Sequence, residues 1–259
     1  LVSVRISKFA IDHNWIIRMP DVVPEGILNS FNSIIPSGLN IIIWYGLGIA
    51  ISYFTKGAMT LGTLVTTVIA TPLSYLVSPL GMVVIIIVFC LSWFFGIHGG
   101  SVVFTAIMPL YIAAYATNAE LAVAGKELVF NPIFLYGAVS ILGGSGNTLP
   151  LCVMGLKSKS KQISAVSKAA LVPGLFNINE PAIFGFPIMY NPILLIPFTL
   201  NSLVVMGFMY VAYKFGLMSL PQVLIMTTLP VGIQSLMSTL DWRNVVFALL
   251  MFPVVYLIY

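Results

Sequence analysis

The apolar stretch PLGMVVIIIVFCLSWFFGI (79–97) contains no charged side chain and decides the fold class of this chain. An α-helix rises about 1.5 Å per residue, so about 20 apolar residues cross the roughly 30 Å of a bilayer's hydrocarbon core. A second uncharged stretch is 34–54, and a third, 101–117, begins directly after His98–Gly100. Repeated stretches of this kind predict a polytopic membrane protein made of α-helices.

The composition contains too few charged residues for a soluble protein. Of the 259 residues, 59% are hydrophobic and 7% are charged, and the mean hydropathy is +1.07. An average soluble domain carries about 25% charged residues. The scarcity excludes a soluble globular enzyme, a disordered chain and a nucleic-acid-binding domain. The net charge of +4 then indicates lysines and arginines at the cytoplasmic side of a membrane, and nucleic acid is not an expected partner.

The polar residues divide the chain into two expected parts. Residues 1–30 hold many of the charged groups and are predicted to be an interfacial lead-in segment, with an amphipathic helix opening at Pro24. Residues 31–259 are predicted to form the transmembrane domain. The chain starts at Leu1 without a signal-peptide pattern and stops within an apolar run at Tyr259, which we interpret as a piece of a longer protein.

Two short apolar segments are interrupted, one by GGSG (143–146) and one by NEP (179–181). Pairs of broken apolar segments point to substrate sites in transporters. The short connection at His98 predicts another break. The fold class predicted is therefore an all-α polytopic membrane protein, with transmembrane helices and re-entrant hairpins around a central substrate site. A weaker span is expected at 216–239 and a last one at 244–259.

The basic cluster of the chain follows the first broken segment. Lys157, Lys159, Lys161 and Lys168 occur with no acidic residue among them. Because cytoplasmic loops of membrane proteins carry an excess of lysine and arginine, the loop 157–168 is predicted to face the cytoplasm.

Two ionisable residues stand in long uncharged stretches. Residues 57–119 contain no Lys, Arg, Asp or Glu, and their only histidine is His98; Glu180 is the only charged residue of 169–213. A charge in the bilayer costs at least ~2.5–3.5 kcal/mol, so such residues are functional candidates. The alternatives are a histidine bonded to a neighbouring helix and a glutamate that caps the helix opening at Pro181.

The glycine-rich run GGSGNT (143–148) allows two interpretations. Its backbone N–H groups could cradle an anion, or it could be a tight turn between two half-helices. It is not a Walker A loop, because no Gly-Lys-Ser/Thr follows. His13 and His98 cannot form a zinc site by themselves, and Cys90 and Cys152 read as small buried hydrophobic residues. No metal and no cofactor is expected.

Several segments together resemble a known family, the membrane-embedded sugar permease (enzyme IIC) of the bacterial phosphotransferase system, in its lactose/cellobiose/diacetylchitobiose branch. The matching segments are PEGILNSFNSIIP (24–36), FGIHGG (95–100), LGGSGNTL (142–149), KSKSKQ (157–162), LVPGLFNINEPAIFGFPIMYNPILLIPF (171–198) and DWR (241–243). Their order and spacing hold along nearly the whole chain, and the longest segment is the most specific.

The resemblance implies a function. The chain would be the C-terminal part of a permease that binds a mono- or disaccharide, with a β-linked sugar of the cellobiose/lactose/chitobiose class expected, and carries it across the bacterial cytoplasmic membrane by an elevator-like movement. Its partners would be the phosphorylated cytoplasmic enzyme IIB, the sugar and the lipid bilayer. The full-length protein would be a homodimer whose N-terminal dimerisation helices this chain lacks. It would be the permease subunit of a protein-phosphohistidine–sugar phosphotransferase rather than a complete enzyme.

The resemblance also implies a site. The histidine and glutamate of the family's motifs fall on His98 and Glu180, which would lie beside the C6 hydroxyl of the sugar and orient it or accept its proton. The sugar-binding residues expected are His98, Gly99, Gly144, Ser145, Asn179 and Glu180. The chain departs from the family pattern at Met226, where a tryptophan is usual, which leaves the identity and size of the sugar open.

Three other functions remain open on the residues alone. The main rival is a proton- or ion-coupled secondary transporter without phosphorylation, in which Glu180 and His98 would carry protons or coordinate ions. A membrane-embedded enzyme and a structural membrane subunit are the others. The catalytic motifs HExxH and GxSxG do not occur in the sequence, which disfavours an intramembrane protease.

Overall fold

The computed structural model describes residues 2–17 and 30–259, apart from the side chains of 65, 66 and 69–73. Within these residues the chain is helical and contains no β-strand, which confirms the all-α prediction. The chain divides into two compact units, Leu1–Val68 and Ile69–Tyr259. The amphipathic helix expected to open at Pro24 begins outside the described residues.

The first unit is built on two contacting helices, α1 (Val2–Asp12) and α3 (Ile34–Phe54). Trp44 donates its indole N–H to the hydroxyl of Ser3 at 3.0 Å, which fastens α3 to α1. Helix α3 coincides with the predicted span 34–54, and its apolar side chains are largely exposed, as a lipid-facing helix requires. Helix α4 (Leu61–Ser74) follows.

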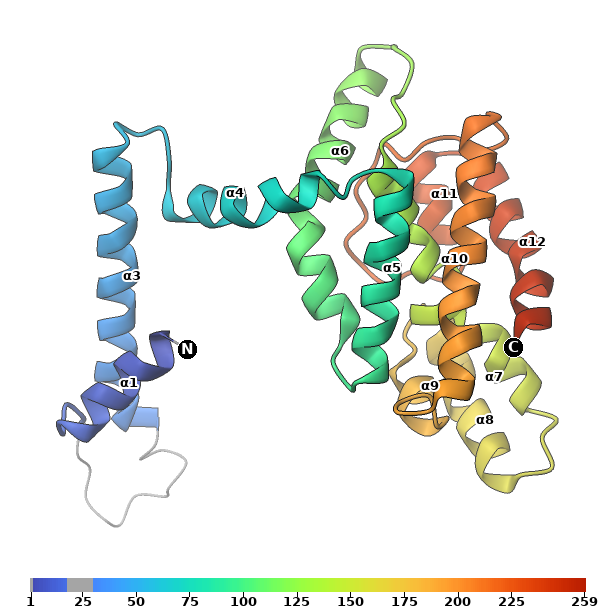
Figure 1. The fold of residues 1–259 in the computed structure, drawn as a ribbon, viewed down its shortest axis with the longest axis horizontal. Coiled ribbons are helices and arrows are strands. Elements are labelled where there is room, and N and C mark those ends of the chain that lie inside the picture. The colour runs from blue at the N-terminus through green and yellow to red at the C-terminus, as the bar shows by residue number, and fades with distance from the viewer. Residues whose placement is uncertain (1, 18–29) are drawn as a thin grey trace. The chain divides into compact units, whose positions relative to one another are not determined.

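The second unit holds the remaining helices (Figure 1). They are α5 (Pro79–Phe94), the π-helix η1 (Gly100–Phe104), α6 (Thr105–Val123), the 3₁₀ helices η2 (Pro132–Val139) and η3 (Ser145–Asn147), α7 (Leu149–Gly155), α8 (Lys161–Leu175), α9 (Glu180–Gly185), α10 (Pro192–Lys214), α11 (Ile233–Thr239) and α12 (Arg243–Ile258). Among the described residues three helical segments are long and apolar enough to span a membrane: Ser30–Phe54, Gly100–Val123 and Pro192–Lys214.

The core of the second unit lies where α5, η2 and α10 meet. Side chains of all three are almost fully buried there, as with Phe89 of α5, Leu135 of η2 and Phe198 of α10. Helix α5 starts sharply because the hydroxyl of Ser78 accepts a hydrogen bond from the N–H of Gly81 and Pro79 opens the first turn.

The chain breaks at His98, as the short connection predicted. Helix α5 ends at Phe94, and Gly96 takes a φ of +75°, a left-handed conformation that glycine adopts at little cost. Tyr190 holds this break from the other side of the fold: its N–H donates to the carbonyl of Phe94 and its hydroxyl to the carbonyl of Phe95. The break is thereby part of the packed structure.

The expectation of a continuous span at 216–239 is wrong. Only α11 is helical there, and most of 217–231 runs without regular structure. Pro221 and Pro230 lack the N–H that a helix needs, which accounts for the interruption. The N–H groups of Gln222 and Val223 instead donate to the carbonyl of Ser238 at 2.9 Å. The predicted last span 244–259 is helical as α12, but its 16 residues make it shorter than the three span-length segments. The predicted loop 157–168 is partly helical, because α8 starts at Lys161.

Candidate functional site

His98 and Glu180 meet in the second unit. The Nε2 atom of His98 lies 3.4 Å from Oε1 of Glu180, and both side chains are nearly half exposed. The N–H of Ser101 donates to Nδ1 of His98 at 3.0 Å. Since Nδ1 accepts, a neutral His98 carries its proton on Nε2 and can donate it to the carboxylate.

The elements around His98 fix the position of its ring. The ring lies 4.4 Å from that of Trp93, centroid to centroid, on the buried face of α5. Gly99 has no room for a side chain, because a Cβ there would lie 2.6 Å from the carbonyl oxygen of Phe89. A glycine after His98 therefore allows this turn to pack directly on α5.

Glu180 is the first residue of α9, followed by Pro181. A negative side chain at a helix N-terminus is favoured by the helix dipole, so the capping interpretation agrees with its position. Yet the carboxylate is directed to His98 rather than to a backbone N–H of its own helix among the described contacts. The position of Glu180 at the start of α9 agrees with a capping role and with a role in a site. The direction of its side chain favours the role in a site, because the carboxylate contacts His98.

The GGSG run forms a tight turn in which two of its backbone N–H groups are already bonded. The N–H groups of Gly143 and Gly144 both donate to Oδ1 of Asn177, at 2.9 and 3.3 Å. The N–H of Asn147 donates to the carbonyl of Gly144. These donors are occupied within the protein, so they are not free to hold an anion.

The two broken segments are joined by asparagine side chains. Asn179 is buried, and its Nδ2 donates to the carbonyl of Ser145 at 2.6 Å. A Cβ on Gly144 would lie 2.6 Å from Cγ of Asn179, so the turn packs closely on this side chain. Asn177 contacts the turn as an acceptor instead, because its Oδ1 accepts from the N–H of Gly143. The asparagines thus tie the GGSG turn to the segment that carries Glu180.

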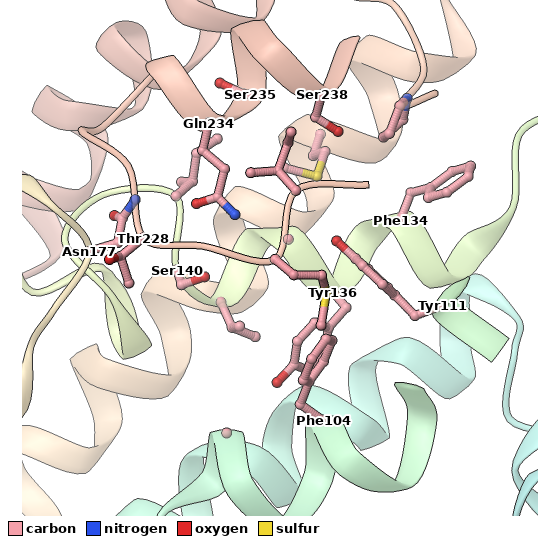
Figure 2. A pocket seen from close by; sticks show the side chains of 18 of the residues that line it. Phe104, Tyr111, Phe134, Tyr136, Ser140, Asn177, Thr228, Gln234, Ser235 and Ser238 are labelled. Carbon is pink, nitrogen blue, oxygen red and sulfur yellow. The ribbon is translucent and has the colours of Figure 1, made fainter. Parts of the chain in front are cut away.

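His98 lines a cavity of about 510 Å³. Figure 2 shows some of the other side chains that line it. Of the predicted site residues, His98 and Ser145 line it, whereas Gly99, Gly144, Asn179 and Glu180 are not among its lining residues. The structure places all six in the same part of the fold, and their predicted contacts with a sugar stay predictions.

The cavity is also lined by residues that were not among the predicted sugar-binding residues. Asn177 belongs to the polar run before NEP and could have been added on that ground. No sequence motif marks Tyr136, Ser140 or Gln234. They belong to irregular or short helical segments, and only the structure shows that these segments meet at the cavity. Met226 is half exposed and also lines the cavity.

The cavity wall is almost free of charge. Among the described residues that line it, His98 is the only one of the ionisable kinds Lys, Arg, His, Asp and Glu. Hydroxyl, amide and aromatic side chains make up much of the rest. Such a wall suits a neutral ligand with many hydroxyl groups better than an ion.

Comparisons with known proteins identify the family. Residues 1–202 match the family model described as "Phosphotransferase system, EIIC". The chain belongs to this EIIC family. The predicted membership of the phosphotransferase-system sugar permease family is confirmed, and the chain is a membrane protein as its family members are. The rival interpretation as a proton-coupled secondary transporter finds no support in these matches.

Individual EIIC relatives are similar to most of the chain. It is 36% identical over 225 residues to the lichenan permease IIC component of Bacillus subtilis (strain 168), covering 85% of this chain and 49% of the relative. It is 35% identical over 210 residues to the lactose-specific EIICB component of Streptococcus mutans serotype c (strain ATCC 700610 / UA159), covering 78% and 36%. The chain spans about half the length of the curated relatives it matches, or less.

A solved structure is similar in fold. The crystal structure of the transporter ChbC, the IIC component of an N,N'-diacetylchitobiose-specific phosphotransferase system, superposes with a TM-score of 0.69 at 30% identity. The match covers 100% of this chain and 60% of ChbC. The helical architecture described above is thus that of an EIIC transporter.

Proposed function

We propose that this chain is the sugar-binding transmembrane part of a phosphotransferase-system permease that takes up a β-linked disaccharide. The observation that carries the proposal is the approach of His98 to Glu180 beside a nearly uncharged cavity of about 510 Å³. That volume lies within the range of about 300–1,000 Å³ found for small-molecule sites. The relatives named for lichenan, lactose and diacetylchitobiose support the sugar class.

The chemistry proposed for the two residues is positioning and proton transfer. The C6 hydroxyl of the sugar donates to the carboxylate of Glu180, and His98 Nε2–H donates to the same hydroxyl oxygen. When the phosphoryl group arrives on the cysteine of enzyme IIB, the hydroxyl oxygen attacks phosphorus. The O–P bond forms, the P–S bond breaks, the cysteine leaves as a thiolate and Glu180 accepts the hydroxyl proton. This is general-base catalysis.

The proposal includes the surroundings of the site. Enzyme IIB is the proposed phosphoryl donor, in agreement with the EIICB composition of the lactose-specific relatives. The segment 157–168 is proposed to face the cytoplasm, residues 1–30 to form an interfacial lead-in and 31–259 the transmembrane domain. The full-length protein is proposed to be a multi-pass homodimer of the bacterial cytoplasmic membrane that moves its substrate domain like an elevator.

The test separates this function from proton-coupled transport. The full-length protein is placed in membrane vesicles, and uptake of radiolabelled cellobiose is followed with and without enzyme IIB and its phosphoryl supply. We expect sugar phosphate to accumulate inside only when the phosphoryl supply is present, whether or not a protonophore is added. Uptake of unmodified sugar that persists without enzyme IIB and collapses with the protonophore would refute the proposal.

A further inference from the structure

The cavity extends from His98 to a wall formed by α11. His98 and Ser101 line one part, at the break between α5 and α6, and Gln234 of α11 lines another. Figure 2 shows the Gln234 side chain reaching from α11 into the cavity. His98 and Glu180 account for one hydroxyl of a ligand, which leaves the part of the cavity at Gln234 without an assigned function.

The cavity wall has one aromatic and one polar side. The rings of Phe104 and Tyr136 are stacked, with their centroids 5.5 Å apart and an angle of 20° between their planes. In Figure 2 this pair lies on the side of the cavity away from Gln234. A sugar ring has an apolar C–H face and hydroxyls around its edge, so an aromatic surface and a polar surface facing each other suit it.

The polar side of the wall has unused hydrogen-bonding groups. Gln234, Ser140 and Thr228 line the cavity and make no side-chain hydrogen bond within the described part of the chain; Thr228 is exposed and the other two are half-buried. A glutamine amide offers two donors and one carbonyl acceptor, which matches hydroxyls that both donate and accept. Because these groups have no partner within the described protein, they are available to bond the hydroxyls of a ligand.

We propose that Gln234 is a specificity-determining residue that binds a hydroxyl of the second sugar ring, the ring that is not phosphorylated. One ring lies with its C6 hydroxyl at His98 and Glu180, and the second lies between the Phe104–Tyr136 pair and Gln234. This inference rests on the proposed function, because it takes the ligand to be a disaccharide. Gln234 of α11 would then allow the protein to distinguish a disaccharide from a monosaccharide.

The experiment compares two glutamine-to-leucine variants of the full-length protein in detergent. Gln234→Leu removes the cavity amide, and Gln162→Leu is the matched control, because Gln162 is exposed on α8 and does not line the cavity. Binding of cellobiose, lactose and N,N'-diacetylchitobiose is measured by calorimetry. Binding of glucose, galactose and N-acetylglucosamine is measured by competition at millimolar concentration.

We expect Gln234→Leu to weaken the binding of the preferred disaccharide by about threefold to tenfold, as the loss of one neutral hydrogen bond does, and to leave monosaccharide binding within twofold of wild type. Gln162→Leu is expected to leave both unchanged. The melting temperature checks the fold of each variant, and Gln234→Asn, which keeps the amide on a shorter side chain, is the second variant.

Two results overturn the inference while leaving the proposed function intact. One is disaccharide binding by Gln234→Leu equal to that of wild type, and the other is an equal loss for disaccharide and monosaccharide. If the wild-type protein binds none of the six sugars, the proposed function fails and this inference fails with it. The binding by the wild type therefore tells the two failures apart.

Discussion

The Nε2 atom of His98 and the Oε1 atom of Glu180 lie 3.4 Å apart although 82 positions separate the two residues in the chain. His98 is placed by the break after α5, and Glu180 by the start of α9. Neither helix could position both groups alone. The contact exists because two interrupted segments pack at the same end of the second unit, where Figure 1 shows α9 and the turn between α5 and α6.

Replacing Glu180 by glutamine tests the proposed general base. Gln keeps the size of the side chain and can still accept a hydrogen bond, but it cannot take the proton of the C6 hydroxyl. We expect Glu180→Gln to lower the rate of sugar phosphorylation by enzyme IIB by about 10²- to 10⁴-fold. Glu127→Gln, at an exposed site outside the cavity, is the control and should retain the wild-type rate. A wild-type rate in both variants would remove Glu180 from the mechanism.

Replacing His98 by alanine tests binding rather than proton transfer. The imidazole is proposed to donate from Nε2, while Nδ1 is occupied by the N–H of Ser101. Removing a hydrogen bond between two neutral groups costs about 0.5–1.5 kcal/mol, so we expect sugar affinity to fall by about 2- to 12-fold. His13→Ala, in the other unit, is the matched control. Calorimetry in detergent measures both, and equal affinities would contradict the assignment.

The Gly144 turn should not tolerate a side chain. A Cβ at Gly144 would lie 2.6 Å from Cγ of Asn179, and its φ of +78° is unfavourable for other residues. We expect Gly144→Ala to destabilise the protein by about 2 kcal/mol or more, since steric overlap and backbone strain add. Gly207→Ala is the control, because a Cβ there meets nothing within 4 Å inside α10. Melting temperatures in one detergent compare them, and an equally stable Gly144→Ala would show that the turn can rearrange.

Asp241 should make the second unit less stable as the pH falls into the acid range. Burial raises the pKa of Asp241, but hydrogen bonds from Ser219 and Arg243 and the charge of Arg243 outweigh it, so the pKa lies below its ordinary value of 3.8. A carboxyl whose pKa is lowered by folding stabilises the protein above the unfolded pKa. That contribution is lost as the pH falls through the folded pKa.

The measurement compares wild type with Asp241→Asn at several pH values. At neutral pH we expect the variant to be less stable by about 2 kcal/mol, because it loses hydrogen bonds made to a charged acceptor. The difference should shrink as the pH falls below about 4. Denaturant unfolding in detergent between pH 7 and pH 3 measures it, and a difference that is independent of pH would contradict the role of the charge.

The sidedness of the lysine segment can be read by cysteine labelling. Cys90 and Cys152 are buried, so the unmodified chain serves as the blank. Lys159 is exposed between α7 and α8, and Val123 is exposed at the end of α6, at the opposite end of the second unit (Figure 1). With a membrane-impermeant maleimide on intact cells, we expect Val123→Cys to react and Lys159→Cys to react only after permeabilisation. The reverse pattern would place 157–168 outside.

The sequence predictions were accurate where a feature depends on neighbouring residues in the chain, and less accurate elsewhere. The predicted span 34–54 has the same bounds as helix α3, because the hydrophobicity and length of an apolar stretch are local properties of the sequence. The break at His98 was also predicted, since too few residues connect two apolar runs. The span expected at 216–239 was wrong because composition alone did not weigh Pro221 and Pro230, which break the helix.

The sequence by itself determined the helical membrane class and the family, and it singled out His98 and Glu180 as candidate site residues. Scarcity of charge and the order of motifs can both be recognised in the sequence without the structure. Only the tertiary structure decided which groups face each other. It placed His98 against Glu180, turned the N–H groups of GGSG to Asn177, and brought Gln234 to the cavity. These relationships join residues far apart in the chain, and they depend on how interrupted helices pack, which no local pattern specifies.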